Sequence, residues 1–394
     1  MRVLLFILSF SFTQISCTEK SSSTPPTSII PGAYQLEEYL PLLEGERVGL
    51  VVNQTSVINN THLVDTLISL NIDIKKVFAP EHGFRGKADA GEKVKDGVDT
   101  KTNLPIVSLY GKNRKPTPEQ FADLDIIIFD IQDVGTRFYT FISTMHYVME
   151  TAAETNKKVF VFDRPNPNGM YVEGPVLNME FKSFVGMHPI PVLHGLTVGE
   201  LAKMINGEKW LTGKLDCDLT VIPLKNWDHN KTFSLPIKPS PNLPNDLSIQ
   251  LYPSLCMFEG TQISVGRGTL FPFQQIGHPS FTDSSYSFTP ISIDGMSKHP
   301  RYQDEVCNGV KFTKENAITG FNISYLIQFY NNYKNINGDA EFFTSYFNTL
   351  AGNKILKEQI IAGKTDEEIK ASWQEDSDKY KDLRKKYLLY PDFE

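Results

Sequence analysis

The stretch LDIIIFDIQD, residues 124–133, decides the fold that this sequence predicts. It begins with a nearly continuous run of β-branched and aromatic residues, the pattern of a strand that is buried on both faces of a sheet. Four further runs of this kind are RVGLVVN (47–53), IKKVFAP (74–80), LPIVSLYG (104–111) and KVFVFDRP (158–165). Helix-like segments lie between them, and this alternation predicts an α/β fold, a parallel sheet flanked by helices.

Three segments illustrate the predicted helices. FYTFISTMHYVMETAAETN (138–156) repeats apolar residues at steps of three and four, so one of its faces packs on the sheet. TVGELAKMIN (197–206) begins with Thr197 followed three residues later by Glu200, which is a capping box. DEEIKASWQEDSDKYKDLRKKYLL (366–389) is rich in charge and predicts a helix on the surface.

The N-terminus carries a targeting signal. MRVLLFILSFSFTQISC (1–17) has one arginine and then an apolar stretch about half as long as the ~20 residues that span a bilayer, so residues 1–16 predict a signal peptide. Cys17 stands where a bacterial lipoprotein is lipidated, and the polar, Pro/Ser-rich residues 17–30 predict a flexible tether. Ordinary cleavage nearby is the alternative. Both interpretations predict export, and lipidation predicts a periplasmic or outer-membrane-anchored lipoprotein that meets the membrane only through its lipid.

Length and composition set further bounds. The mature chain is long enough for two domains, and we place them at 31–230 and 231–394 because Pro, Asn and Gly become frequent from about residue 226. The net charge of -7 argues against a nucleic-acid partner. Cys217, Cys256 and Cys307 show no C-x-x-C spacing, so neither a disulfide framework nor a metal site is predicted.

Polar side chains follow every predicted strand. Ligands of open parallel sheets bind beyond the carboxyl ends of the strands, so these side chains predict a single cleft. Caps and turns would explain one or two such positions, but carboxylates follow three of the five strands. The residues concerned are Asn53, Gln54, Glu81, His82, Arg85, Tyr110, Asp130, Gln132, Asp133, Arg137, Tyr139, Asp163, Arg164, Asn166 and Asn168.

The common cofactor and nucleophile motifs are absent. The sequence has no dinucleotide fingerprint after its first strand, no phosphate-binding loop, no G-x-S-x-G and no H-E-x-x-H. Carboxylates among amides, arginines and tyrosines remain. Such groups bind sugars, and a pair of carboxylates cleaves glycosidic bonds, one as the acid and the other as nucleophile or base. A glycosidase is therefore one activity that these residues allow.

Several long motifs are similar to those of one known family. GLVVNQTS, FAPEHGFRG, DIQDVGTRFYTF, DRPNPNG, HGLTVGELA, PSPNLP and FEGTQISVGRGT resemble the NamZ-type exo-β-N-acetylmuramidases, exported proteins long described as a domain of unknown function. The resemblance runs from about residue 46 to beyond 275. It implies a Rossmann-like domain with a smaller α+β C-terminal domain and the active site in the cleft between them. It also implies release of N-acetylmuramic acid from non-reducing ends of peptidoglycan fragments without a cofactor.

Three carboxyls are the predicted catalytic groups. Glu81 in PEHGF is the first choice, and an acid that merely caps a turn is its alternative. Asp133 is better placed to face the cleft than Asp130, which ends a buried strand. Glu259 in MFEGTQ would bring the Pro-rich passage over the site. Retaining, inverting and substrate-assisted mechanisms all remain open, because the separation of the carboxyls is not visible in a sequence.

Substrate contacts are predicted for the other polar residues at the strand ends, including His82, and for Glu173, His194, Asn242 and Arg267. N-acetylmuramic acid carries a lactyl carboxylate, which suits a guanidinium partner. The candidates for that partner are Arg85, Arg137, Arg164 and Arg267.

Two other functions compete with the muramidase. A non-catalytic lipoprotein that binds glycan or muropeptide in the same cleft would need the amides, aromatic residues and arginines, but no carboxyl tuned for proton transfer. Hydrolysis of an ester or amide is disfavoured by the missing nucleophile motifs.

Overall fold

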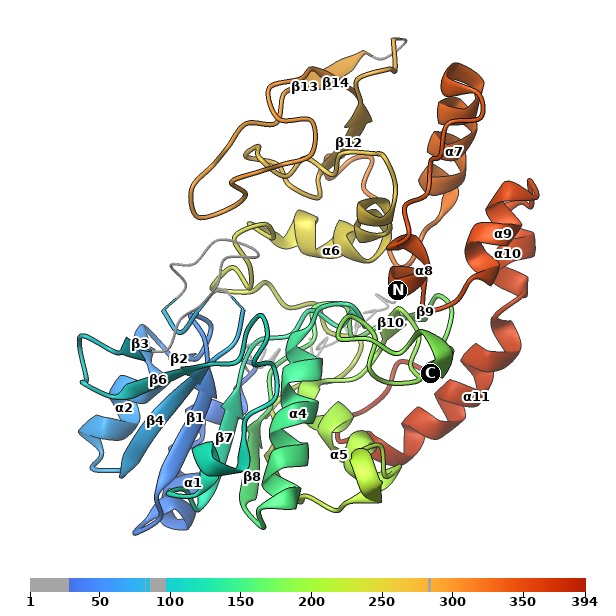
Figure 1. Cartoon of the computed structure of the whole chain (residues 1–394). Helices are drawn as coiled ribbons and strands as arrows, with labels where there is room; N and C mark the ends of the chain where they lie inside the picture. Colours follow the sequence, from blue (N-terminus) through green and yellow to red (C-terminus); the bar gives the residue numbers. More distant parts are fainter. Residues whose placement is uncertain (1–27, 82, 86–96, 283–284) are drawn as a thin grey trace, which may run out of the picture.

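The computed structural model describes residues 28–81, 83–85, 97–282 and 285–394. A seven-stranded sheet in the order β11-β8-β7-β1-β4-β6-β5 forms the centre of the N-terminal part (Figure 1). All neighbouring strands are parallel except β5 and β6. The strands are β1 (Val48–Val52), β4 (Ile74–Ala79), β5 (Gly97–Val98), β6 (Pro105–Ser108), β7 (Ile126–Asp130), β8 (Lys158–Phe162) and β11 (Asp218–Ile222).

The five predicted strands are confirmed, and β11 is a sixth parallel strand that the sequence analysis missed. β11 lies at the edge of the sheet and is only partly buried. Its sequence DLTVI therefore mixes polar and apolar residues and lacks the continuous apolar run of β7.

Helices cover both faces of the sheet because successive side chains of a strand point to opposite faces. Ile127 and Phe129 of β7 belong to one apolar core, and Ile126 and Ile128 belong to the other. The first core includes side chains of α3, α4 and α5, and the second includes side chains of α1 and α2. The bounds are α1 (Leu36–Leu43), α2 (Leu63–Ser69), α3 (Pro118–Phe121), α4 (Phe141–Glu154) and α5 (Val198–Gly207).

Short elements complete the N-terminal part. Two small antiparallel pairs join β2 (Val57–Ile58) with β3 (Thr61–His62), and β9 (Val172–Glu173) with β10 (Leu193–His194). Three 3-10 turns are η1 (Gly32–Tyr34), η2 (Met179–Phe181) and η3 (Thr212–Lys214). The capping box predicted at Thr197 and Glu200 is confirmed at the start of α5.

The C-terminal part is α+β, as the resemblance implies. A three-stranded antiparallel sheet in the order β12-β14-β13 lies at the top of Figure 1, away from the parallel sheet. The elements are α6 (Asp246–Leu255), η4 (Cys256–Gly260), β12 (Gln275–His278), β13 (Tyr286–Phe288), β14 (Cys307–Lys311), α7 (Ser324–Asn337), α8 (Phe347–Ala351), α9 (Ile355–Ile361), α10 (Asp366–Ala371), α11 (Gln374–Arg384) and η5 (Lys385–Tyr387). The boundary near residue 230 stays a prediction.

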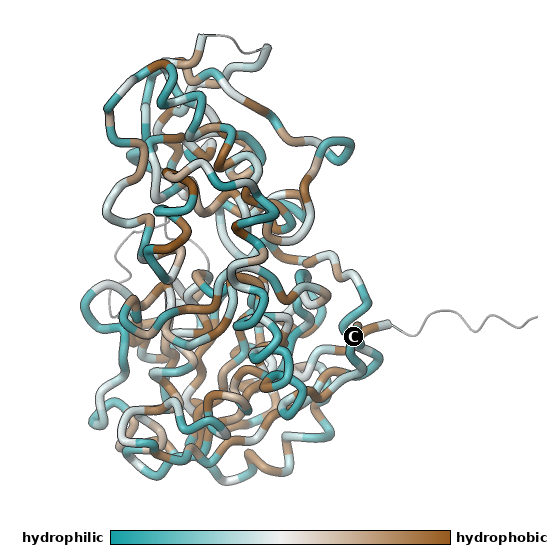
Figure 2. The backbone as a smooth tube through the Cα atoms, turned by 90° about the vertical axis from the view of Figure 1, so that its right-hand side faces the viewer, coloured by the Kyte–Doolittle hydropathy of each residue, from teal (hydrophilic) through white to brown (hydrophobic). Residues whose placement is uncertain are grey.

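The two parts share one apolar core. Phe258 and Phe329 of the C-terminal part belong to the same buried cluster as Ile127 of the sheet. Figure 2 shows hydrophobic segments gathered inside the lower half of the molecule, with hydrophilic segments around them. Among the helices in the described ranges, none is both long and apolar enough to cross a lipid bilayer.

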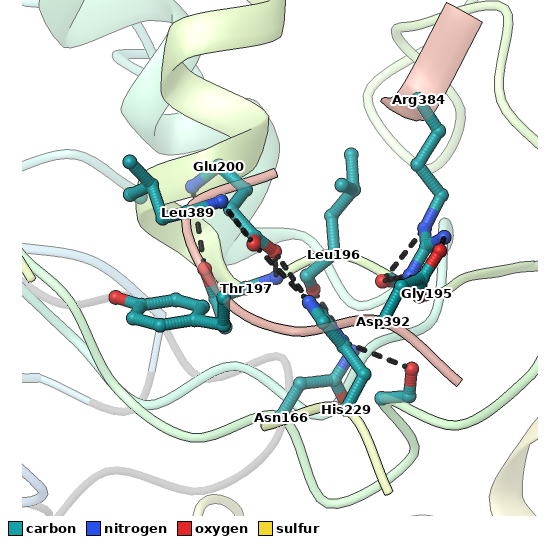
Figure 3. Close-up of polar contacts among 12 residues, drawn as sticks. Asn166, Gly195, Leu196, Thr197, Glu200, His229, Arg384, Leu389 and Asp392 are labelled. Atoms are coloured by element: carbon teal, nitrogen blue, oxygen red, sulfur yellow. Dashed lines mark hydrogen bonds and ion pairs between the residues drawn. The ribbon is translucent and has the colours of Figure 1, made fainter. Parts of the chain in front are cut away.

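The last segment of the chain packs back onto the N-terminal part. The charged surface helix predicted over 366–389 is confirmed in part: most of the segment is helical and much of it is exposed, but α10 ends at Ala371, α11 begins at Gln374, and Arg384 is fully buried. Arg384 donates to the Gly195 carbonyl at 2.8 and 3.0 Å and pairs with Asp392 at 2.7 Å (Figure 3). These partners satisfy the guanidinium, so a charged residue can lie in the interior.

Candidate active site

A cavity of about 270 Å³ lies at the carboxyl ends of β4, β6 and β7 and is closed from the other side by the C-terminal part. Ligands of open α/β sheets bind at this edge. The volume is just below the ~300–1,000 Å³ typical of drug-sized ligands, and it suits one sugar residue. The lining residues are Glu81, Tyr110, Arg114, Phe138, Tyr139, Thr140, Phe141, Phe184, Val185, Ser240, Asn242, Leu243, Tyr252, Arg267, Phe273 and Tyr346.

Glu81 supplies the only carboxyl group among the described lining residues. It follows β4 by two residues, and Tyr110 follows the neighbouring strand β6 by two. The two side chains are hydrogen-bonded, and burial together with the negative charge of Glu81 raises the pKa of Tyr110 to about 12. The tyrosine is therefore protonated at neutral pH, and its hydroxyl donates a hydrogen bond to the carboxylate. This contact fixes the carboxyl group against the cavity wall.

Tyr139 and Asn242 place two unsatisfied polar atoms in the cavity wall. The Tyr139 hydroxyl and the Asn242 Oδ1 are buried and have no hydrogen-bond partner among the described residues. Burial, with the charges of Asp133 and Glu81, raises the pKa of Tyr139, so its hydroxyl is a donor. Asn242 donates through Nδ2 to the Met296 carbonyl at 3.0 Å, which leaves Oδ1 as an acceptor. Buried polar atoms without partners are uncommon, and these two belong to residues that line the same cavity.

Aromatic side chains form much of the remaining wall. The Tyr252 ring packs edge-on against Phe138, Tyr139 and Phe273, with ring centroids 5.5, 5.9 and 5.0 Å apart. Tyr252 comes from α6, so these contacts join the C-terminal part to the loop after β7. Rings held in this way offer a rigid apolar surface to the faces of a sugar.

Arg267 also lines the cavity, and Glu259 lies behind it. The Arg267 Nε donates to Glu259 Oε1 at 2.6 Å, and the guanidinium lies 5.0 Å from the centre of the Phe273 ring. Glu259 is absent from the cavity lining. Its carboxylate is occupied by the arginine, so we assign it the positioning of Arg267 in place of the predicted catalytic role.

Asp133 and His194 are buried next to the cavity but not in its lining. Asp133 Oδ2 accepts from the Gly135 amide at 2.6 Å and lies 3.7 Å from His194 Nε2. Asp133 Oδ1 and His194 Nε2 have no hydrogen-bond partner in the described part of the chain. Asp133 acts on Tyr139 through its charge. Direct contact of these side chains with substrate stays a prediction, since neither residue lines the cavity.

Three predicted ligands of the lactyl group or sugar have internal partners instead, namely Arg137, Arg164 and Asp130. Arg137 is fully buried, and its two Nη atoms donate to the carbonyls of Pro175, Ile190, Leu350 and Ala351 at 2.7–3.0 Å. Arg164 binds Asp130 in a bidentate pair at 2.6 and 2.8 Å. Both guanidinium groups are held by these internal contacts, and neither arginine lines the cavity, so we infer structural roles for them.

Asp163 has an internal role as well. Its carboxylate accepts from the Thr197 hydroxyl at 2.7 Å and from the Gly199 amide at 2.8 Å, at the start of α5. Beside it, Glu200 accepts from the Leu389 amide at 2.8 Å and contacts His229 at 3.1 Å, as Figure 3 shows. This network holds α5 and the C-terminal segment together. Asp163 therefore stabilises the fold, and it does not line the cavity.

The remaining predicted contacts also lie outside the cavity lining. Arg85 is bound to Asp99 at 2.7 Å and to Asp65 at 3.2 Å. Glu173 accepts from the Phe321 amide at 2.6 Å. The four amides have internal partners: Asn53 with Thr55, Gln54 with Lys238 and Pro239, Gln132 with Asp133 and Pro165, and Asn166 with Leu196 and Asn168. His82 and Cys17 lie outside the described residues.

The lining residues that sequence reasoning did not name include Arg114, Phe184 and Tyr346. Arg114 lies in a loop between β6 and α3, and Tyr346 precedes α8 far along the chain. Neither stands in a motif or directly after a strand. Only the folded chain brings them to the cavity.

A larger cavity of about 550 Å³ lies between α9, α11 and the loop at residues 175–178. Its walls are mainly apolar and include Trp210 and Trp373, and its one carboxylate, Asp376, is exposed. It is lined by no residue that directly follows a strand of the parallel sheet. We therefore place the active site in the smaller cavity, where Glu81 and the unsatisfied groups converge.

Comparison with known proteins agrees with this geometry. A family model described as "Exo-beta-N-acetylmuramidase NamZ, N-terminal" matches residues 48–247, and its C-terminal counterpart matches residues 250–390. The chain belongs to the NamZ family. The resemblance seen in the sequence is thereby confirmed. A relative from Bacillus subtilis strain 168, "Peptidoglycan beta-N-acetylmuramidase NamZ", is 42% identical over 382 residues, which cover 90% of this chain and 89% of the relative.

Two solved structures share the NamZ fold. Both are described as DUF1343 family proteins of Bacteroides fragilis NCTC 9343. The first is 45% identical, with a TM-score of 0.85, and the match covers 93% of this chain and 100% of that one. The second is 32% identical, with a TM-score of 0.79, and covers 92% and 99% of the two chains. The predicted two-domain α/β fold is confirmed.

Proposed function

We propose that this NamZ-family protein is an exo-acting glycoside hydrolase that releases N-acetylmuramic acid from the non-reducing ends of peptidoglycan fragments. The proposal rests mainly on one observation. Glu81 lines the same small cavity as Tyr139 and Asn242, each of which has a buried polar atom without a hydrogen-bond partner among the described residues. A carboxyl group performs the proton transfer, and the unsatisfied groups recognise the sugar.

The donor and acceptor match the 2-acetamido group of an N-acetylated sugar. The Tyr139 hydroxyl donates to its carbonyl oxygen, and Asn242 Oδ1 accepts from its N–H. Without ligand both atoms remain unpaired inside the protein, which costs stability, and binding of the acetamido group removes that cost. The aromatic wall around Tyr252 packs against the apolar face of the ring.

Glu81 is the catalytic carboxyl in this proposal. In its protonated form it gives its proton to the glycosidic oxygen as the bond to the anomeric carbon breaks, so that the remaining glycan leaves as an alcohol. A water molecule forms the new bond to the anomeric carbon, and the proton that this water loses restores the carboxyl group. Tyr110 holds the Glu81 carboxylate in place through its hydrogen bond. The small volume of the cavity accepts one terminal sugar, which accounts for exo-action.

Defined oligosaccharides test this function. Peptidoglycan fragments that end at the non-reducing side in N-acetylmuramic acid are incubated with the purified protein, in parallel with fragments that end in N-acetylglucosamine. Mass spectrometry should detect free N-acetylmuramic acid from the first set only. Binding of the fragments without any release would establish the glycan-binding lipoprotein instead, and internal cleavage would contradict exo-action.

We also propose that the protein is exported and anchored by a lipid at Cys17, on the strength of the signal-like sequence 1–17. Metabolic labelling with radioactive palmitate should mark the wild type and not Cys17→Ser. Equal labelling of both proteins, or of neither, would contradict the lipid anchor.

A further inference from the structure

N-acetylmuramic acid differs from N-acetylglucosamine by a lactyl ether whose carboxylate is negative at neutral pH. An enzyme that selects the first sugar needs a cation at the position of this group. Of the four arginines predicted for the role, Arg85, Arg137 and Arg164 are occupied by carboxylates or carbonyls outside the cavity. Arg267 lines the cavity, but Glu259 neutralises its charge at 2.6 Å.

Arg114 is the other arginine of the cavity wall. No carboxylate lies within 4.0 Å of its guanidinium among the residues that the structure describes. Its side chain is exposed at the mouth of the cavity, and its positive charge acts on Tyr110, the partner of Glu81. Arg114 is therefore close to the catalytic carboxyl, and within the described ranges no acidic side chain occupies its guanidinium.

A stack of aromatic rings supports Arg114. The guanidinium carbon lies 4.4 Å from the centre of the Phe184 ring, and the Phe184 ring stacks on Tyr147 of α4 at 6.2 Å. The Ser143 hydroxyl of α4 donates to the Phe184 carbonyl at 2.7 Å and fixes this segment. A contact between the guanidinium and an aromatic ring uses none of the N–H donors in an ion pair, so they can bind a carboxylate.

Resting on the proposed function, we infer that Arg114 binds the lactyl carboxylate and thereby selects N-acetylmuramic acid over N-acetylglucosamine. Arg114 is a specificity-determining residue, and it takes no part in proton transfer. Arg267, already paired with Glu259, shapes the wall of the cavity for either sugar.

The test compares two substrates on matched variants. The first substrate is 4-nitrophenyl β-N-acetylmuramide, and the second is the same compound with its lactyl carboxylate converted to the neutral amide. Arg114→Gln should lower kcat/KM for the acid roughly 10- to 100-fold, the scale of a hydrogen bond to a charged group, and leave that for the amide nearly unchanged. Arg114→Lys should retain part of the preference for the acid over the amide. Lysine keeps the positive charge but lacks the paired N–H donors with which a guanidinium binds a carboxylate.

Two control variants separate this effect from general loss of charge or of shape. Lys112→Gln removes an exposed positive charge two residues away and should preserve the preference for the acid. Arg267→Gln should lower kcat/KM for both substrates by the same factor. An undiminished preference for the acid in Arg114→Gln, or equal losses on both substrates, would overturn the role of Arg114. A wild type that cleaves neither substrate would instead overturn the proposed function.

Discussion

The Tyr110 hydroxyl is hydrogen-bonded to the carboxylate of Glu81 across the ends of the neighbouring strands β6 and β4. Tyr110→Phe removes only this hydroxyl and keeps the ring. We expect kcat to fall roughly 10-fold, because the carboxyl group loses the charge-assisted hydrogen bond that orients it. KM should change little, since Tyr110 acts through Glu81. Steady-state kinetics on the chromogenic muramide would reveal a dispensable contact if kcat were unchanged.

Tyr139→Phe should separate activity from stability. The Tyr139 hydroxyl is buried without a partner, so its removal should leave the free energy of unfolding unchanged or slightly higher. The same change should lower kcat/KM roughly 10- to 100-fold, because the acetamido carbonyl loses its donor. Urea unfolding and kinetics on one protein preparation check both expectations. If the variant lost stability but kept full activity, the Tyr139 hydroxyl would have a structural role and would not bind the sugar.

Arg137→Met should destabilise the protein by about 3–5 kcal/mol, the scale of removing one partner from a buried charged network. The variant leaves four carbonyls unpaired where the segments at 175–190 and 350–351 meet. Urea unfolding measures the loss. Arg114→Gln serves as the matched control, because Arg114 is exposed and should change stability by less than about 0.5 kcal/mol. Equal stability of the two variants would contradict the structural role of Arg137.

These contrasts show what the sequence could and could not predict. The buried run of β7 follows directly from local pattern. The position of polar residues after the strands placed Glu81 and Tyr139 in the site, and the resemblance added Asn242 and Arg267. Arg137 and Arg164 were predicted as ligands because a sequence does not show whether a polar group is satisfied internally. Arg114 and Tyr346 reach the cavity only through tertiary contacts, so no local sequence pattern predicts their place in it.

The stability of the protein should fall in mild acid through His278 of β12. Burial, together with the positive charge of Arg301, lowers the pKa of His278 to about 4. Its ring packs against Phe281, Tyr302 and Tyr333, and its Nδ1 accepts from the Ser280 amide at 3.0 Å. The unfolded chain, with a histidine pKa near ~6.5, binds more protons between pH 6.5 and 4. The stabilisation is thus present above pH ~6.5 and is lost as pH falls towards 4.

His278→Asn keeps a hydrogen-bond acceptor but does not titrate in this range. The free energy of unfolding of the wild type should drop by about 2 kcal/mol more than that of the variant between pH 7 and pH 4.5. Urea unfolding at both pH values measures the difference. Parallel losses in the two proteins would show that other groups cause the acid sensitivity.

The most direct test of the account is hydrolysis of 4-nitrophenyl β-N-acetylmuramide by the wild type and by Glu81→Gln, with the matching glucosaminide as the comparison substrate. We predict that the wild type cleaves the muramide, and that Glu81→Gln lowers its turnover at least ~100-fold with circular dichroism and unfolding unchanged. Cleavage of neither glycoside by the wild type, or a turnover in Glu81→Gln close to that of the wild type, would contradict the assignment of Glu81 as the catalytic carboxyl of a muramidase.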